Sequence, residues 1–508
     1  MHCVRSNVAN QRKVGAVLGY ANIIVKNLVN LVYTPMLLTF VGQADYGVFQ
    51  TSNSFVFSLS LLSFGFSGAY VRFYTINMAN GDDQDIRSLN GLYLLLYLIA
   101  AIAALMLGLL FAANVQVFFS SSFTAEQVGL ASTLMAIMAV SVAVTLLSTV
   151  FDAYIMTHEE FRFQQTRQLF TTLATPIVAF CLLCAGMGAV GVAIAQLAVN
   201  VALLLLNARF AIVRLNMRFD MRHFDGRTFR AIAVFSVWLF ANQVCDLVNQ
   251  NVPNMLLGAL TSATEVAVFA VAVQIRSVFI SLSLALSNVF VPKINQIVAT
   301  SDDNIALTRL MTRVGRYQML LLSWVYCGFV LLGQFFVTRW AGDGFADAYW
   351  MICAMTLPLL VPLCQNTGIE IQRAKNKHKA RSIVCLVMAL VSVVFTWVFF
   401  TWLGYWAAAI AYILSIILGN VLFMNWYYQK SIGLDMAFYW KRNLPIAVAS
   451  AIVVAAGLFV MRYVPVTSWI GFVIWGLAYS AVFALVMWAF VLDDGEKGSM
   501  LNRLSVGR

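Results

Sequence analysis

The chain has 508 residues, of which 61% are hydrophobic and only 10% are charged, and its net charge is +11. An ordinary soluble domain carries about 25% charged residues, so this chain has too few to cover a surface exposed to water. The composition excludes a soluble enzyme, a nucleic-acid-binding protein and a disordered protein. Long apolar runs favour a membrane protein built of helices over a β-barrel, whose strands show only weak alternation.

Apolar runs long enough to cross a bilayer, about 20 residues each, follow one another along the chain. The runs lie at 16–39, 48–71, 91–113, 127–151, 168–186, 190–210, 231–256, 266–291, 318–338, 349–370, 383–402, 404–427, 444–463 and 468–491. They predict an all-α polytopic membrane protein with about fourteen transmembrane helices.

The basic residues are distributed unevenly between the loops on the two sides. With the N-terminus inside, only Arg339 and Arg462 lie at or beside the expected external loops. Basic residues gather in cytoplasmic loops and set the topology of a membrane protein. The pattern therefore predicts that both termini are cytoplasmic, and it accounts for the net charge without an acidic partner.

An internal repeat is found at an offset of 220 residues. Residues 42–49 (GQADYGVF) align with 262–269 (SATEVAVF), and His158 aligns with His378. Spans 1–6 then repeat as spans 7–12 in the same orientation. Parallel repeats of this kind form transporters that bind substrate between two lobes and alternate access by rocking.

The repeat divides the chain into four predicted parts. They are an N-terminal lobe at 1–210, a cytoplasmic linker at 211–230, a C-terminal lobe at 231–428, and two extra spans with a cytoplasmic tail at 429–508.

Three charged residues fall near the middle of predicted spans: Lys26 on span 1, Asp246 on span 7 and Arg276 on span 8. A charge at the bilayer centre costs about 2.5–3.5 kcal/mol on insertion scales, so it indicates a function. Asn22 and Asn30 share a helix face with Lys26, and Asn242 shares one with Asp246. The pattern predicts that spans 1, 2, 7 and 8 line a polar cavity.

Two interpretations of these charges stay open. Lys26 or Arg276 could form an ion pair with Asp246 that only holds the lobes together. Alternatively, two cations and one acid make a cationic cavity, which suits an anionic headgroup. Asp246 could also take part in ion coupling, because a buried carboxylate can gain a proton or bind a cation.

Span 10 carries a second polar cluster. Asn366 and Glu370 are four residues apart and share a helix face, after Pro358 and Pro362. Alternatively, Glu370 simply ends the span beside the basic run at 373–381, which we expect to contact anionic membrane lipids. The four His and eight Cys form no pattern for a metal or redox site, so we expect no cofactor.

Several short motifs resemble one known family. They are Thr34-Pro35, residues 42–49, residues 64–74 (FGFSGAYVRFY), Phe151-Asp152-Ala-Tyr154 leading to His158-Glu159-Glu-Phe161, and residues 373–379 (RAKNKHK). In these motifs and in length the chain resembles the Wzx-type O-antigen and exopolysaccharide flippases. This family forms the polysaccharide-transport branch of the MOP superfamily.

The resemblance implies a bacterial inner-membrane protein of lipopolysaccharide or exopolysaccharide biosynthesis. Its substrate would be an undecaprenyl-diphosphate-linked oligosaccharide, moved from the cytoplasmic to the periplasmic leaflet. Lys26 and Arg276 would meet the diphosphate, with Arg72 a weaker candidate near the cytoplasmic mouth. A polysaccharide polymerase and its chain-length regulator would be partners.

The resemblance also implies a coupling-cation site, for H+ or Na+, in the second lobe. A span-7 acid and an Asn-xxx-acid pattern on span 10 form it in related flippases. Asp246, Asn366 and Glu370 match this pattern loosely.

Two rival functions are considered. A MATE-like multidrug exporter of the same superfamily should have an acidic cavity for cationic drugs, which Lys26 and Arg276 oppose. A polysaccharide polymerase or ligase commonly needs a sizeable external loop. The expected external loop near 339–348 is short and offers only Arg339, Asp343 and Asp347 as charged side chains for glycosyl transfer.

Overall fold

The structure is a computed structural model that describes residues 2–81, 83–221, 230, 232–234, 236, 240, 243–244, 247–248 and 251–498. For residues 2–17 and 20 it describes the backbone alone. By its internal contacts the chain divides into two compact units. Unit 1 comprises Met1–Ala270 and Val393–Ala408, and unit 2 comprises Val271–Ser392 and Ala409–Arg508. The lobes expected at 1–210 and 231–428 stay a prediction, since most of 231–250 lies outside the described residues.

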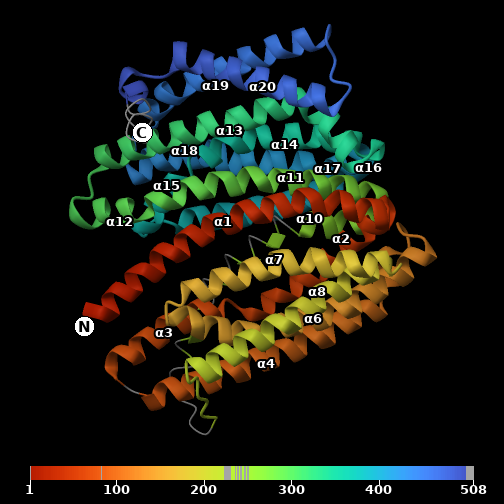
Figure 1. The fold of residues 1–508 in the computed structure, drawn as a ribbon, viewed down its shortest axis with the longest axis vertical. Helices are drawn as coiled ribbons and strands as arrows, with labels where there is room; N and C mark the ends of the chain where they lie inside the picture. The colour runs from red at the N-terminus through yellow and green to blue at the C-terminus, as the bar shows by residue number, and fades with distance from the viewer. Residues whose placement is uncertain are drawn as a thin grey trace. The chain divides into compact units, whose positions relative to one another are not determined.

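Unit 1 is built from helices over the residues that the structure describes (Figure 1). In chain order they are α1 (His2–Val41), α2 (Gln43–Phe57), η1 (Ser58–Ser63), α3 (Phe66–Asn80), α4 (Asp83–Ala113), α5 (Val115–Phe119), α6 (Ala125–Thr157), α7 (Phe161–Cys184), α8 (Gly188–Arg209), η2 (Phe210–Arg214) and α10 (Val252–Leu260). Helix α11 (Ala263–Ser287) begins in unit 1 and continues into unit 2.

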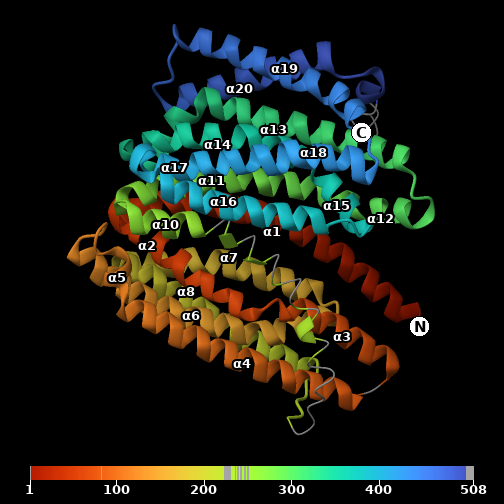
Figure 2. The ribbon, with the colours of Figure 1, turned by 180° about the vertical axis from the view of Figure 1, so that it is seen from behind.

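Unit 2 is also helical over its described part (Figure 2). Its elements are η3 (Asn288–Phe290), α12 (Val291–Thr300), α13 (Asn304–Ala341), η4 (Asp343–Phe345), α14 (Ala346–Cys364), α15 (Asn366–Ala374), α16 (Lys379–Leu403), α17 (Trp406–Ser415), η5 (Ile416–Phe423), α18 (Met424–Tyr427), η6 (Tyr428–Ile432), α19 (Met436–Met461), α20 (Trp469–Val486) and η7 (Met487–Val491). The end of α16 and the start of α17 belong to unit 1.

Thirteen helical segments in the described residues are long and apolar enough to cross a membrane. Each overlaps one of the fourteen predicted spans, and the all-α polytopic fold is confirmed. The remaining predicted span, 231–256, lies largely outside the described residues. Several helices are longer than their apolar runs. For example, α13 begins at Asn304, whereas the apolar run begins near residue 318.

Small residues bring the helices of unit 1 close together. Helices α4, α6 and α8 run side by side (Figure 1). A Cβ atom added at Gly108 of α4 would lie 2.4 Å from the Cβ atom of Ala139 on α6. Likewise, a Cβ atom at Gly258 of α10 would lie 2.3 Å from the side chain of Thr51 on α2. These contacts are typical of membrane helices, where association depends on close packing rather than on hydrophobic burial.

The segment that follows η2 is attached to the start of α4 and to the end of α6, where the Tyr154 hydroxyl donates to the Leu215 carbonyl oxygen at 3.2 Å. Asn90, which is 1% exposed, donates its side-chain amide to the carbonyl oxygen of Arg218 at 2.9 Å. The amide of Asp220 donates to the carbonyl oxygen of Arg87 at 3.0 Å. A Cβ atom at Gly91 would lie 2.1 Å from the Asp220 carbonyl oxygen, so only glycine fits there. The first half of the predicted 211–230 linker is therefore fixed to unit 1.

Helix α13 is the central element of unit 2. It packs against α14, α19 and α20 (Figure 2). Buried side chains from these helices form one hydrophobic cluster, which includes Leu322, Leu359, Ile446 and Phe483. The two helices beyond the repeat, α19 and α20, are therefore part of the packed body of unit 2.

Candidate functional site

Arg276 is buried within unit 2. It lies on α11 and is only 4% exposed. Its guanidinium carbon lies over the ring of Tyr412 on α17, 4.1 Å from the ring centroid. No carboxylate of the described residues pairs with it, and its Nε atom is buried without a hydrogen-bond partner. A buried cation that keeps its donors free is suited to bind an anion.

Lys26 and its neighbours lie on α1 of unit 1. Lys26 is exposed and forms no ion pair within the described part of the chain. Asn22 is buried, and its side-chain amide donates to the backbone oxygen of Gln165 at 2.9 Å and to its side-chain oxygen at 2.8 Å. Asn22 thus links α1 to α7, whereas the half-buried Asn30 has no described partner of this kind.

Three further predicted site residues lie directly after span 2 or on span 7. Arg72 lies on α3 and is exposed. Asn242 and Asp246 lie outside the described residues, so the predicted pairing of Asp246 with Lys26 or Arg276 is not tested.

The polar cluster of span 10 lies at a helix break. Helix α14 contains Pro358 and Pro362 and ends at Cys364, and α15 begins at Asn366. Proline removes a backbone donor and obstructs the preceding turn, which accounts for the break. At the break Asn366 is buried inside unit 2, and its side-chain amide donates to the Ser283 hydroxyl at 2.7 Å. Gln318 donates to the same hydroxyl at 3.0 Å, and its own carbonyl oxygen is buried without a partner.

Glu370 does not belong to the cluster that Asn366 forms with Ser283 and Gln318. Glu370 forms an ion pair of 2.7 Å with Arg373, three residues further along α15. Asn366 donates instead to Ser283 of α11, which also accepts from Gln318 of α13. Sequence reasoning missed Ser283 and Gln318. Both are polar residues within apolar stretches, and that pattern is the signal that could have identified them.

A second buried arginine was not predicted as a functional or structural centre. Arg316 on α13 is 6% exposed and donates to both carboxylate oxygens of Glu496, at 2.7 and 2.8 Å. It also donates to the backbone oxygens of Arg442 and Val491. Burial raises the pKa of Glu496, but the hydrogen bonds from Arg316 and from the backbone of Asp493, together with the positive charges of Arg316 and Arg442, outweigh this, so the pKa lies below its usual value. This arginine is fully used in joining α13 to the chain around α19 and η7.

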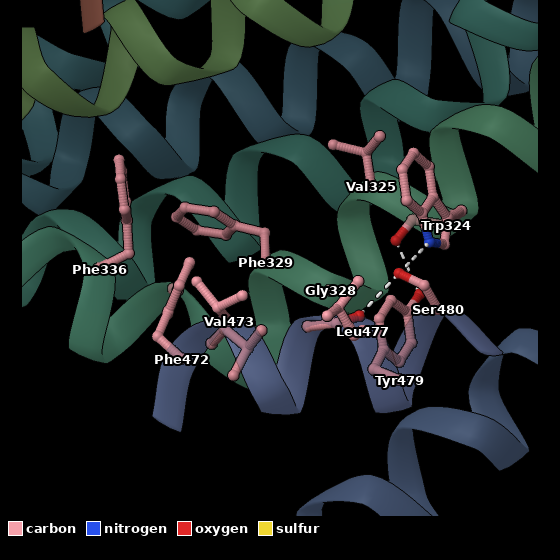
Figure 3. A pocket seen from close by; sticks show the side chains of 13 residues that line it. Trp324, Val325, Gly328, Phe329, Phe336, Phe472, Val473, Leu477, Tyr479 and Ser480 are labelled. Atoms are coloured by element: carbon pink, nitrogen blue, oxygen red, sulfur yellow. Dashed lines mark hydrogen bonds between the residues drawn. The ribbon is translucent and has the colours of Figure 1, made fainter. Parts of the chain in front are cut away.

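The groove between α13 and α20 has a different character. It has a volume of about 460 Å³ and is lined mainly by aromatic and aliphatic side chains, as Figure 3 shows. Its polar contacts are internal: Trp324 Nε1 donates to Ser480 Oγ at 3.1 Å, and Tyr479 Oη donates to the Trp324 carbonyl oxygen at 2.7 Å. The groove therefore offers no charged group to a headgroup. Within the described residues, no cluster of His, Cys, Asp or Glu could hold a metal ion.

Solved structures with the same fold are membrane transporters. One is described as the lipid II flippase MurJ in an inward closed conformation; its TM-score is 0.73 at 15% identity, and the match covers 93% of this chain and 98% of that chain. Another is an inward-facing multidrug resistance MATE family transporter of the MOP superfamily, with a TM-score of 0.62 at 14% identity, covering 82% and 98%. An outward-facing MATE family transporter has a TM-score of 0.54 at 15% identity, covering 82% and 95%.

The fold is therefore that of the MOP-superfamily transporters, and the chain is a multi-pass membrane protein. A sequence profile described as polysaccharide biosynthesis protein matches residues 14–298, more than half of the chain. The chain thus belongs to the polysaccharide biosynthesis protein family. No curated protein sequence matches it at a significant level.

Proposed function

We propose that the chain is a flippase for undecaprenyl-diphosphate-linked oligosaccharide. It moves the lipid-linked unit from the cytoplasmic to the periplasmic leaflet of a bacterial inner membrane by alternating access of two lobes. The family and the fold shared with a lipid II flippase support this function. The observation that carries it is Arg276, a buried guanidinium with no carboxylate partner among the described residues.

In this proposal the diphosphate is the group that the protein must desolvate and carry. Arg276 binds its oxygens through charge-assisted hydrogen bonds, which a guanidinium can make in pairs. Lys26 supplies a second positive charge, and Arg72 is a weaker contact near the cytoplasmic mouth. Asn22, Asn30 and Asn242 add polar lining.

Transport would be coupled to a gradient of H+ or Na+. Asp246, Asn366 and Glu370 are the proposed ion-coupling residues. A carboxylate inside the membrane responds to a proton or a cation because its own charge is costly there. We expect Asp246→Asn to leave transport insensitive to either gradient, and gradient-independent transport by the unmodified protein would contradict the coupling.

The proposed surroundings follow from the same function. The bias of basic residues supports cytoplasmic N- and C-termini. Membrane lipids surround the protein, and a polysaccharide polymerase with its chain-length regulator would receive the flipped product for O-antigen or exopolysaccharide assembly.

The test is a flipping assay with purified protein in vesicles. The substrate is undecaprenyl-diphosphate oligosaccharide with a fluorescent group on the sugar, and a membrane-impermeant quencher reports its leaflet. We expect Arg276→Ala to lower the rate at least tenfold, because one charge-assisted hydrogen bond is worth about 1.5–3 kcal/mol. Arg339→Ala is the matched control, since Arg339 is an exposed arginine of the same unit. A flipping rate of Arg276→Ala equal to that of the wild type would overturn the proposal.

The same vesicles separate the rival functions. A MATE-like exporter would move a fluorescent organic cation and not the lipid-linked sugar. A polymerase or ligase would lengthen or transfer the oligosaccharide, which mass measurement of the recovered lipid would reveal.

A further inference from the structure

The ring of Tyr412 is the contact that defines the surroundings of Arg276. The two residues come from different helices of unit 2, α11 and α17, and the guanidinium carbon lies 4.1 Å from the ring centroid. The face of an aromatic ring attracts a cation, most strongly when both are shielded from water. Tyr412 can therefore stabilise the charge of Arg276 in a buried position.

A ring differs from a carboxylate in what it leaves available. A carboxylate would neutralise the guanidinium and occupy two of its five N–H donors, as Glu496 does for Arg316. The π face of Tyr412 carries no net charge, so it does not balance the positive charge of Arg276. Within the part of the chain that the structure describes, its Nε atom also has no hydrogen-bond partner. The arrangement stabilises the cation and leaves it able to bind an anion.

The ring itself is held firmly. Tyr412 packs against the hydrophobic cluster of unit 2, together with Ile275 of α11. Ala409 and Ala411, beside it on α17, are fully or almost fully buried, so the helix is closely packed at this level. No hydrogen bond is described for the Tyr412 hydroxyl, so the ring rather than the hydroxyl carries the interaction.

We propose that Tyr412 is a positioning residue of the anion site, whose ring holds the guanidinium of Arg276 charged, buried and oriented for the diphosphate of the substrate. This role rests on the proposed flippase function. It adds a residue of the twelfth predicted span to a site that the sequence places on spans 1, 2, 7 and 8.

The first test compares variants of Tyr412 in binding of undecaprenyl diphosphate by the purified full chain. We expect Tyr412→Phe to bind within about twofold of wild type, because it keeps the ring. Tyr412→Leu should weaken binding about tenfold or more. Phe483→Leu is the control, since it removes a buried ring of α20 from the same hydrophobic cluster, and its described ring contact is with Tyr479. Equal losses in Tyr412→Phe and Tyr412→Leu would overturn the role of the ring.

A double-mutant cycle separates positioning from a general structural role. If Tyr412 acts through Arg276, then Tyr412→Leu costs no further affinity in an Arg276→Ala background. Additive losses would overturn the proposal. The two proposals also fail differently. Normal binding and flipping by Arg276→Ala would contradict the function, whereas normal behaviour of Tyr412→Leu beside an inactive Arg276→Ala would contradict only the role of Tyr412.

A second series covers the case in which Tyr412→Leu does not fold. Phenylalanines with one, two and three ring fluorines at position 412 keep the shape while weakening the negative potential of the ring face. We expect affinity for undecaprenyl diphosphate to fall stepwise with each fluorine, while thermal unfolding temperatures stay alike. Constant affinity across the series would show that the ring does not act through its attraction for the cation.

Discussion

Arg276 and Arg316 are both buried in unit 2, at 4% and 6% exposure, and their surroundings differ. Arg316 donates to a carboxylate and to two backbone carbonyl oxygens, so its charge and donors are used by the protein itself. Arg276 lies over an aromatic ring, and its Nε has no hydrogen-bond partner among the described residues. Burial is therefore common to both arginines, and they differ in the donors that the fold leaves unused. In the proposed function, those unused donors are what suit Arg276 to bind the anionic ligand.

The largest effect should come from breaking the Arg316 pair. Glu496→Ala leaves Arg316 buried without its carboxylate, and we expect a loss of about 3–5 kcal/mol in the free energy of unfolding. Chemical unfolding of the purified protein in detergent measures this loss. Arg276→Ala is the contrasting variant, which should lose flipping but little stability. Equal stability losses in the two variants would break the comparison.

The sequence was sufficient for the membrane helices because each is a long apolar run, and Arg276 and Lys26 were identified because charge is rare in such runs. Arg316 was missed for the opposite reason. It lies at the basic edge of its predicted span, near Arg309 and Arg313, where arginine is expected as a topology signal. Its partner Glu496 is 180 residues away. No local pattern indicates that pairing.

Tyr412 and Ser283 could not be predicted for another physical reason. An aromatic residue in an apolar run is what any membrane helix contains, so only the crossing of α11 and α17 gives Tyr412 its contact with Arg276. Ser283 likewise becomes notable only because Asn366 and Gln318 reach it from two other helices. Which residues meet across helices depends on packing, which the apolar pattern does not determine.

The second-largest effect is expected from a variant that gives Arg276 a carboxylate partner, as Arg316 has. Tyr412→Glu places a carboxylate beside the guanidinium, which would neutralise it and occupy its donors. We expect flipping to fall about 30-fold, since losing a charge-assisted hydrogen bond to the substrate costs about 2 kcal/mol. The variant should still insert, and its unfolding temperature should stay close to that of Arg276→Ala. Wild-type flipping by Tyr412→Glu would mean that the charge of Arg276 is not what the substrate uses.

Acid should weaken the Arg316 pair while leaving the surroundings of Arg276 unchanged. The pKa of Glu496 is lowered from its ordinary value of 4.5: burial raises it, and the hydrogen bonds from Arg316 and the Asp493 backbone, with the charges of Arg316 and Arg442, together lower it by more. The stabilisation is therefore complete above the unfolded pKa and is lost as the pH falls through the lower folded pKa. We expect the unfolding temperature to fall below pH 4.5 in the wild type, more steeply than in Glu496→Gln. Equal slopes would contradict this assignment.

The smallest effect concerns the exposed ion pair beside Arg316. Arg442 and Asp493 pair at 2.6 Å, but their side chains are 47% and 54% exposed, so water and salt screen the attraction. We expect Asp493→Ala to cost less than about 1 kcal/mol in unfolding free energy. Asp493→Asn is the matched control, because it keeps the size of the side chain. The backbone oxygen of Arg442, which accepts from Arg316, is unchanged in both variants. A loss as large as that of Glu496→Ala would mean that the two pairs act as one network, in which case the stability attributed to Arg316 belongs to all four charges.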